Sequence, residues 1–170
     1  MTSNGGHTRC LLGGTFDRLH HGHKDLLRAG LEAASHLEVH VTTDSMAFAK
    51  DHRIQSMEDR MAAVEAALRS VRETGWSLHM LEDAFGPAPT HPTADALVVS
   101  PETRTGGEAI NRKRSESGLA PLTLIEVPHR RNATGTILSS TAIRNGSMDV
   151  TGEAWINPSW RTHVIAMLSL

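Results

Sequence analysis

Hydrophobic and polar positions change their spacing along this chain in a way that predicts alternating strands and helices. Residues 9–12 form a short apolar run typical of a buried strand, and residues 24–35 repeat apolar side chains with the period of a helix. Residues 37–43 return to the alternation of a strand, and a short helical turn then leads to Lys50. The first part of the chain therefore predicts strand, helix, strand and helical turn.

The clearest helix is predicted from residue 56 to residue 71. Ser56 and Asp59 form a start that resembles a capping box. Apolar side chains then recur at the helical spacing: Met57, Met61, Val64, Leu68 and Val71. The pattern leaves Arg60 undecided between solvent and a functional site.

Three further strands are predicted over residues 76–81, 94–99 and 122–127, and a proline-rich loop follows the first of them. A helix from residue 106 to about residue 117 and a short helix ending before Asn145-Gly146 complete the pattern. We interpret this order as a strand followed by a helix, five times. It predicts an α/β, Rossmann-like domain with a five-stranded parallel sheet and helices on both faces.

The length of 170 residues fits one folded domain. We expect residues 1–8 to be a flexible N-terminal segment and residues 9–150 to form the domain. Residues 151–170 are expected to be a helical extension, because Asn157-Pro158 is a good helix start and the following apolar residues share one face. That helix would pack on its own domain or at a subunit contact, so a homo-oligomer stays open.

Composition narrows the possible partners and the compartment. A net charge of −2 argues against a nucleic-acid-binding protein, which usually carries a basic excess. No apolar run reaches the length of a membrane span, and the first seven residues do not resemble a signal peptide. The single cysteine, Cys10, is expected to be a buried strand residue, which fits a reducing cytoplasm.

The segment between the first strand and the first helix carries the strongest chemical signal. It reads Gly13-Gly14-Thr15-Phe16-Asp17 and continues to His20-x-Gly22-His23. Two glycines would let the chain turn sharply and expose backbone N–H groups, and a helix start favours an anion. The two histidines would face the same ligand, and imidazole can bind phosphate and carry charge near neutral pH. A helix cap without chemistry is the alternative, and a metal site involving His21 lacks acidic or cysteine partners at a recognised spacing.

Other polar groups follow the later strands, at the edge of a parallel sheet where ligands bind. Lys50 follows the second strand and Ser100-Pro101-Glu102-Thr103 follows the fourth. Ser139-Ser140-Thr141 with Arg144 follows the fifth, and could hold the outer phosphates of a nucleotide. The basic run over residues 111–114 stays open between a solvated helix face and a substrate contact.

These motifs resemble those of a known group of enzymes. The first is similar to the HxGH signature of the cytidylyltransferase-like nucleotidyltransferase superfamily, and residues 138–144 resemble its ISSTxIR motif with Leu138 in the first position. Together with residues 98–103 and 110–122, they resemble the phosphopantetheine adenylyltransferase family of the archaeal and eukaryotic type. The chain contains no Walker A or GxGxxG sequence, which disfavours P-loop kinases and dinucleotide-binding dehydrogenases.

The resemblance implies that AMP is transferred from ATP to 4′-phosphopantetheine, giving dephospho-coenzyme A and pyrophosphate. It implies that His23 contacts the α-phosphate, that His20 lies on the triphosphate, and that Lys50 neutralises the incoming phosphate. It also implies a set of nucleotide-binding residues: Gly13, Gly14, Thr15, Phe16, Asp17, Gly22, Ser100, Glu102, Ser139, Ser140, Thr141 and Arg144.

Mg²⁺ is expected to bridge phosphate oxygens of ATP. No protein ligand for the metal is assigned. Asp17 could be considered for that role, or it could brace the turn. Two alternative functions stay open: a related nucleotidyltransferase with another phosphorylated acceptor, such as glycerol phosphate or FMN, and a nucleotide-binding module without turnover.

Overall fold

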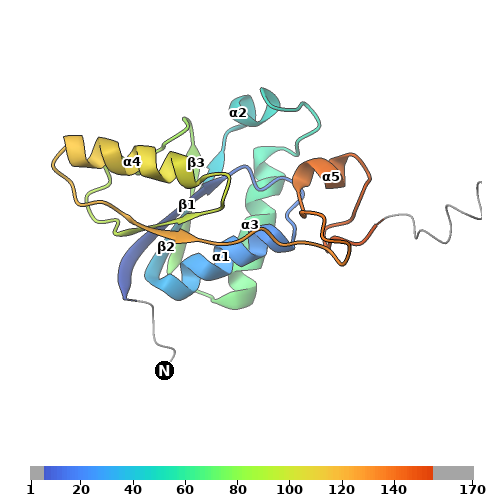
Figure 1. The fold of residues 1–170 in the computed structure, drawn as a ribbon, viewed down its shortest axis with the longest axis horizontal. Coiled ribbons are helices and arrows are strands. Elements are labelled where there is room, and N and C mark those ends of the chain that lie inside the picture. Colours follow the sequence, from blue (N-terminus) through green and yellow to red (C-terminus); the bar gives the residue numbers. More distant parts are fainter. Residues whose placement is uncertain (1–5, 155–170) are drawn as a thin grey trace, which may run out of the picture.

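A parallel sheet of five strands forms the centre of the computed structural model, which describes residues 6–154 (Figure 1). The strands are β1 (His7–Gly14), β2 (Ala34–Thr42), β3 (Trp76–Leu81), β4 (Ala96–Val99) and β5 (Thr123–Glu126). Their order in the sheet is β3-β2-β1-β4-β5, and each neighbouring pair is parallel. The predicted five-stranded parallel sheet is therefore confirmed, with its switch of direction beside β1.

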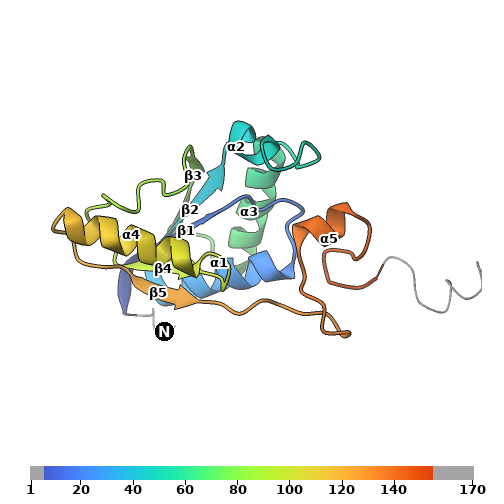
Figure 2. The ribbon, with the colours of Figure 1, turned by 45° about the horizontal axis from the view of Figure 1, so that its top comes forward.

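Helices cover both faces of this sheet, as the sequence predicts (Figure 2). They are α1 (His21–Ala33), α2 (Asp44–Phe48), α3 (Met57–Val71), α4 (Arg104–Glu116) and α5 (Ser140–Arg144). Helices α1 and α3 pack on one face and α4 packs on the other. Because both faces are covered, β1 and β4 carry buried apolar side chains on both sides. In β2, the apolar Leu37, Val39 and Val41 alternate with the buried polar Glu38, His40 and Thr42.

Side chains of β1 point alternately to the two faces of the sheet and so pack into two different hydrophobic cores. Cys10 and Leu12 point into the core beneath α1 and α3, whereas Leu11 points into the core beneath α4. All three side chains are almost completely buried. Burial raises the pKa of the Cys10 thiol to about 12, so this cysteine is a packed strand residue, as predicted.

Pairing between strands moves several boundaries away from their predicted positions. The register of β1 with β2 runs from His7 opposite Ala34 to Gly14 opposite Val41, so β2 begins directly after α1 without a loop. The prediction of a flexible segment up to residue 8 is wrong for its last two residues, which belong to β1. The Asp95 carboxylate accepts hydrogen bonds from the backbone N–H groups of Thr8 and Arg9, at 2.8 and 3.0 Å.

The prediction of five consecutive strand–helix units is wrong between β3 and β4. Residues 82–95 cross over without a helix, because Gly86 and the prolines that follow interrupt regular hydrogen bonding. Arg114 of α4 donates to backbone carbonyls of this crossover, including Ala88 O at 2.8 Å and His91 O at 3.0 Å. The interpretation of the whole basic run 111–114 as a solvated helix face is therefore wrong, since Arg114 is only 2% exposed.

The predicted helix after Asn157 lies outside the described residues. The last described residues pack on the domain, where Asn132 Nδ2 donates to Gly152 O at 3.1 Å. Within residues 6–154, none of the helices combines the length and the apolar character needed to cross a membrane.

Close packing between α1 and β2 predicts the effect of a small substitution. A Cβ atom on Gly30 would lie 2.6 Å from Cδ1 of the fully buried Leu37. Gly30→Ala should lower the free energy of unfolding by about 1–3 kcal/mol despite the better helix propensity of alanine. Gly106→Ala in α4 is the matched control, because its Cβ would meet nothing within 4 Å. Urea denaturation measures both, and a Gly30→Ala protein as stable as the control would contradict this packing.

Candidate active site

One cleft of about 1100 Å³ lies at the carboxyl end of the sheet and collects the residues that the sequence predicts for a site. Its lining includes every one of them: Gly13, Gly14, Thr15, Phe16, Asp17, His20, Gly22, His23, Lys50, Ser100, Glu102, Ser139, Ser140, Thr141 and Arg144. Protein sites for a single small ligand usually have volumes of roughly 300–1,000 Å³. The volume of this cleft therefore lies just above the upper end of that range.

The turn after β1 bends at different residues from those the sequence predicts. Gly13 and Gly14 belong to β1, and the left-handed backbone occurs at Phe16 and Arg18, with φ of 55° and 49°. A side chain in that region costs roughly 1–2 kcal/mol. Gly14 is needed for a different reason, because a Cβ there would lie 3.0 Å from the Phe16 ring.

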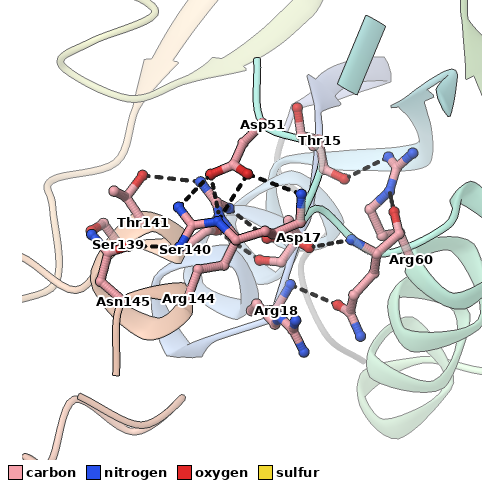
Figure 3. A network of polar contacts seen from close by, with 12 residues as sticks. Thr15, Asp17, Arg18, Asp51, Arg60, Ser139, Ser140, Thr141, Arg144 and Asn145 are labelled. Atoms are coloured by element: carbon pink, nitrogen blue, oxygen red, sulfur yellow. Dashed lines mark hydrogen bonds and ion pairs between the residues drawn. The ribbon is translucent and has the colours of Figure 1, made fainter. Parts of the chain in front are cut away.

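Asp17 braces this turn with its side chain and its carbonyl (Figure 3). The carboxylate is 1% exposed, accepts from the Gln55 N–H at 2.9 Å, and pairs with Arg144 Nη1 at 2.5 Å. Ser140 Oγ donates to the Asp17 carbonyl at 2.7 Å. Since both carboxylate oxygens are occupied by protein donors, the structure favours the bracing role of Asp17 over a metal-ligand role.

His20 and His23 form a reciprocal cap at the start of α1. His20 Nδ1 accepts from the His23 N–H at 3.4 Å, and His23 Nδ1 accepts from the His20 N–H at 3.3 Å. Their rings stack with centroids 3.8 Å apart. A Cβ on Gly22 would lie 3.1 Å from the His20 ring, so this position needs a glycine.

The cap also fixes which ring nitrogen can meet a ligand. Because each Nδ1 accepts a backbone hydrogen bond, a neutral ring carries its proton on Nε2. Neither Nε2 atom hydrogen-bonds within the described part of the chain. The helix-capping alternative is thus correct for Nδ1, and both rings keep an Nε2–H donor for the cleft.

The two rings are uncharged at neutral pH, contrary to the expectation from the sequence. Burial, followed by the charge of His21, lowers the pKa of His20 to about 4. Burial, followed by His20, lowers the pKa of His23 to about 3. The cleft therefore offers a phosphate two neutral hydrogen-bond donors rather than two cations.

The residues of α5 interact with one another and with the turn rather than facing the cleft as free hydroxyls. Ser139 Oγ accepts from the Ala142 N–H at 3.2 Å and caps the helix. Thr141 Oγ1 accepts from Arg144 Nη2 at 3.2 Å. Arg144 is also held by Asp51, with 3.3 Å between Nε and Oδ2. The groups of this motif left for a ligand are therefore mainly the first backbone N–H groups of α5.

Lys50 and the segment after β4 complete the lining. Lys50 follows α2 and is exposed; its backbone N–H donates to the Ala47 carbonyl at 3.0 Å, and its ammonium makes no ion pair or hydrogen bond with a described residue. Ser100 and Thr103 hydrogen-bond to each other before α4, with Thr103 Oγ1 accepting from the Ser100 N–H at 2.8 Å. Glu102 is exposed and lies 3.9 Å from His129 Nε2. Lys50 thus brings to the cleft a cation without a side-chain partner among the described residues.

Sequence reasoning missed Asp51, which lines the cleft, and left Arg60 undecided between solvent and a functional site. Arg60 is fully buried in α3 and binds the Thr15 carbonyl from behind the turn. A signal for its burial exists, because position 60 is four residues before Val64 on the apolar face of the helix. No comparable local pattern marks Asp51.

These features define a nucleotide-binding site of the nucleotidyltransferase type: a histidine-capped helix after the first strand and a second capped turn after the fifth. Residues 11–146 match the model of the cytidylyltransferase-like family, so the chain belongs to that family.

Comparison with individual proteins shows to which family within this larger group the chain belongs. The chain is 37% identical to the phosphopantetheine adenylyltransferase of Methanopyrus kandleri over 145 residues, which are 83% of this chain and 90% of that protein. It is 35% identical to the phosphopantetheine adenylyltransferase of Thermococcus kodakarensis over 146 residues, which are 85% and 88% of the two chains. A solved structure of a protein with unknown function from Archaeoglobus fulgidus superposes with a TM-score of 0.65 and 29% identity, covering 71% of this chain and 89% of that one. Within its class, the protein is a member of the phosphopantetheine adenylyltransferase family.

The neutral state of His20 predicts a dependence of stability on pH. Its pKa of about 4 lies below the unfolded value of 6.5, so the unfolded chain takes up a proton first as the pH falls. The stability that His20 contributes is complete above pH 6.5 and is lost between pH 6.5 and pH 4. His20→Asn keeps a capping side chain without this titration.

Between pH 7 and pH 5, the free energy of unfolding should fall by about 2 kcal/mol more in the wild-type protein than in His20→Asn. Urea denaturation at the two pH values measures the difference. Equal losses in both proteins would show that His20 is protonated alike in the folded and unfolded states.

Proposed function

We propose that this protein transfers AMP from ATP to 4′-phosphopantetheine, giving dephospho-coenzyme A and pyrophosphate. The observation that carries the proposal is the pair of Nε2–H donors on His20 and His23, fixed by the cap of α1 in the same cleft as Lys50. The phosphopantetheine adenylyltransferases that match most of the chain support this choice of acceptor. They also support coenzyme A synthesis as the setting of the reaction.

The chemistry needs alignment and charge stabilisation rather than a strong base. An oxygen of the acceptor phosphate attacks the α-phosphorus of ATP, and the bond from that phosphorus to the bridging oxygen of the β-phosphate breaks, releasing pyrophosphate. A phosphate monoester is largely dianionic at neutral pH, so the nucleophile requires no deprotonation. Neutral donors suit this reaction, because His23 can hydrogen-bond the α-phosphate as its charge grows without giving up its proton.

Lys50 would reduce the repulsion between two phosphate groups. Its ammonium has no partner among the described residues, so it loses no interaction within the protein when it meets a substrate. Thr15 would orient the reacting phosphates from the turn after β1. Holding both substrates in one geometry can account for much of the acceleration of such a reaction.

The remaining predicted residues would hold the nucleotide. The first N–H groups of α5 would face the β- and γ-phosphates, and Arg144 would support them through Asp17 and Asp51. Ser100 and Glu102 would contact the nucleotide from the segment after β4. Gly14 and Gly22 would act by leaving room for the rings of Phe16 and His20.

Mg²⁺ would enter with ATP as part of the substrate. Within residues 6–154, no three histidine, cysteine, aspartate or glutamate side chains converge to hold a metal ion. The carboxylates of Asp17 and Asp51 are already bound to arginines. A metal bridging the phosphates would therefore take most of its ligands from phosphate oxygens and water, as Mg²⁺ commonly does with nucleotides.

The proposed function is tested by pyrophosphate release from ATP with a panel of acceptors. We expect release with 4′-phosphopantetheine and at least a hundredfold lower kcat/KM with glycerol 3-phosphate or FMN. Faster release with another acceptor would assign the protein to that reaction instead. ATP binding without release for any acceptor would indicate a nucleotide-binding module.

His23→Ala should lower kcat at least a hundredfold, which corresponds to about 3 kcal/mol of lost transition-state stabilisation. The variant also loses part of the cap of α1, so a control for capping is needed. Ser56→Ala removes the side-chain cap of α3, where Ser56 Oγ accepts from the Asp59 N–H at 3.2 Å. Its kcat should stay within twofold of the wild type. A His23→Ala protein with similar turnover would remove His23 from the mechanism.

A further inference from the structure

The turn that carries Thr15 is held in a strained shape from one side by an arginine outside the sequence motifs. Phe16 and Arg18 both have left-handed backbone, which persists only where surrounding contacts enforce it. Asp17, Arg144 and Ser140 fix the turn on the side of α5. On the opposite side the contact is Arg60 of α3, whose Nη1 donates to the Thr15 carbonyl at 2.9 Å.

The guanidinium of Arg60 also binds three other residues of the chain. Nη1 also donates to the Thr42 carbonyl at 2.9 Å, where β2 ends. Nε donates to the Gln55 carbonyl at 2.8 Å, and Nη2 pairs with the Asp44 carboxylate at 3.0 Å. Gln55 in turn returns to the strained turn, since its side-chain oxygen accepts from the Arg18 N–H at 2.8 Å. Figure 3 shows Arg60 beside Thr15, on the side of the turn away from Arg144.

The segments joined by Arg60 are those that carry the proposed reacting groups. The turn at Thr15 leads to the histidine cap of α1, and the end of β2 at Thr42 leads through α2 to Lys50. Thr42 Oγ1 also donates to Thr15 Oγ1 at 3.3 Å, so the two segments touch beside the guanidinium. A planar group with fixed donor directions sets the spacing between them, which a flexible ammonium cannot do.

We propose that Arg60 is a positioning residue for nucleotidyl transfer: it fixes the α-phosphate-binding turn relative to the segment that carries Lys50. Arg60 is fully buried and does not belong to the cleft lining, so it would act through Thr15 and Thr42. This proposal rests on the proposed function. Small displacements of reacting groups lower the rate of the chemical step more than they lower substrate binding.

A matched control exists at the other end of the sheet. Arg72 likewise donates to several backbone carbonyls, among them Leu31 O at 3.1 Å and Gly75 O at 2.8 Å. These partners lie at the C-terminal end of α1 and just before β3, away from the cleft lining. Replacing either arginine by lysine removes a comparable fork of hydrogen bonds, but only Arg60 contacts the turn at Thr15.

The test compares Arg60→Lys with Arg72→Lys by steady-state kinetics and urea denaturation of the full chain. We expect both variants to lose stability. Arg60→Lys should lose at least tenfold in kcat, while KM for ATP and for 4′-phosphopantetheine stays within threefold. Arg72→Lys should keep kcat within twofold of the wild type. Equal kcat values in the two variants, or a loss in Arg60→Lys confined to KM, would overturn the positioning role.

A second variant keeps the proposal testable if Arg60→Lys does not fold. Asp44→Ala removes the carboxylate that, within residues 6–154, pairs with Arg60 and also accepts from the Met57 N–H at 2.6 Å, and it affects a partly exposed side chain. It should lower kcat severalfold at unchanged KM, and an unchanged kcat would overturn the proposal. A wild-type protein that releases no pyrophosphate with any acceptor would instead refute the proposed function, so the two failures are distinguishable.

Discussion

The buried carboxylate of Asp17 is the contact on which the phosphate end of the cleft depends. It accepts from the Gln55 N–H and pairs with Arg144, which lies 127 residues further along the chain. Removing one partner of a buried ion pair costs about 3–5 kcal/mol, because the other charge is left without compensation. The strained turn at Phe16 and Arg18 is thus tied to both the segment before α3 and the end of α5.

Irregular backbone at the edges of this sheet is stabilised by arginines rather than by further secondary structure. Arg60 binds carbonyls at the carboxyl end, Arg72 binds those around the start of β3, and Arg114 binds those of the crossover 82–95. Buried carbonyl groups need donors, and a guanidinium offers five in a fixed plane. The fold can therefore keep loops of unusual shape at the edges of the sheet without leaving these carbonyl groups unpaired.

Apolar spacing in the sequence predicted the five strands and α3, and the ends of the strands predicted much of the cleft lining. The sequence did not predict the features that depend on contacts between residues far apart in the chain. The register of β1 and β2 extends β1 to His7, and burial makes His20 and His23 neutral. The bend at Phe16 instead of Gly14 depends on contacts from α3 and α5, which no local pattern encodes.

His20 and His23 cap α1 reciprocally. Because of this, fraying of the first turn of the helix also displaces both Nε2–H donors. In many proteins the first turn of a helix opens far more often than the whole fold. Here each opening would release both rings at once, so the population of open turns sets the fraction of molecules in which the two Nε2–H donors are held in place. Amide hydrogen exchange at His23, whose N–H is held by His20, therefore reports the competence of the site in the absence of substrate.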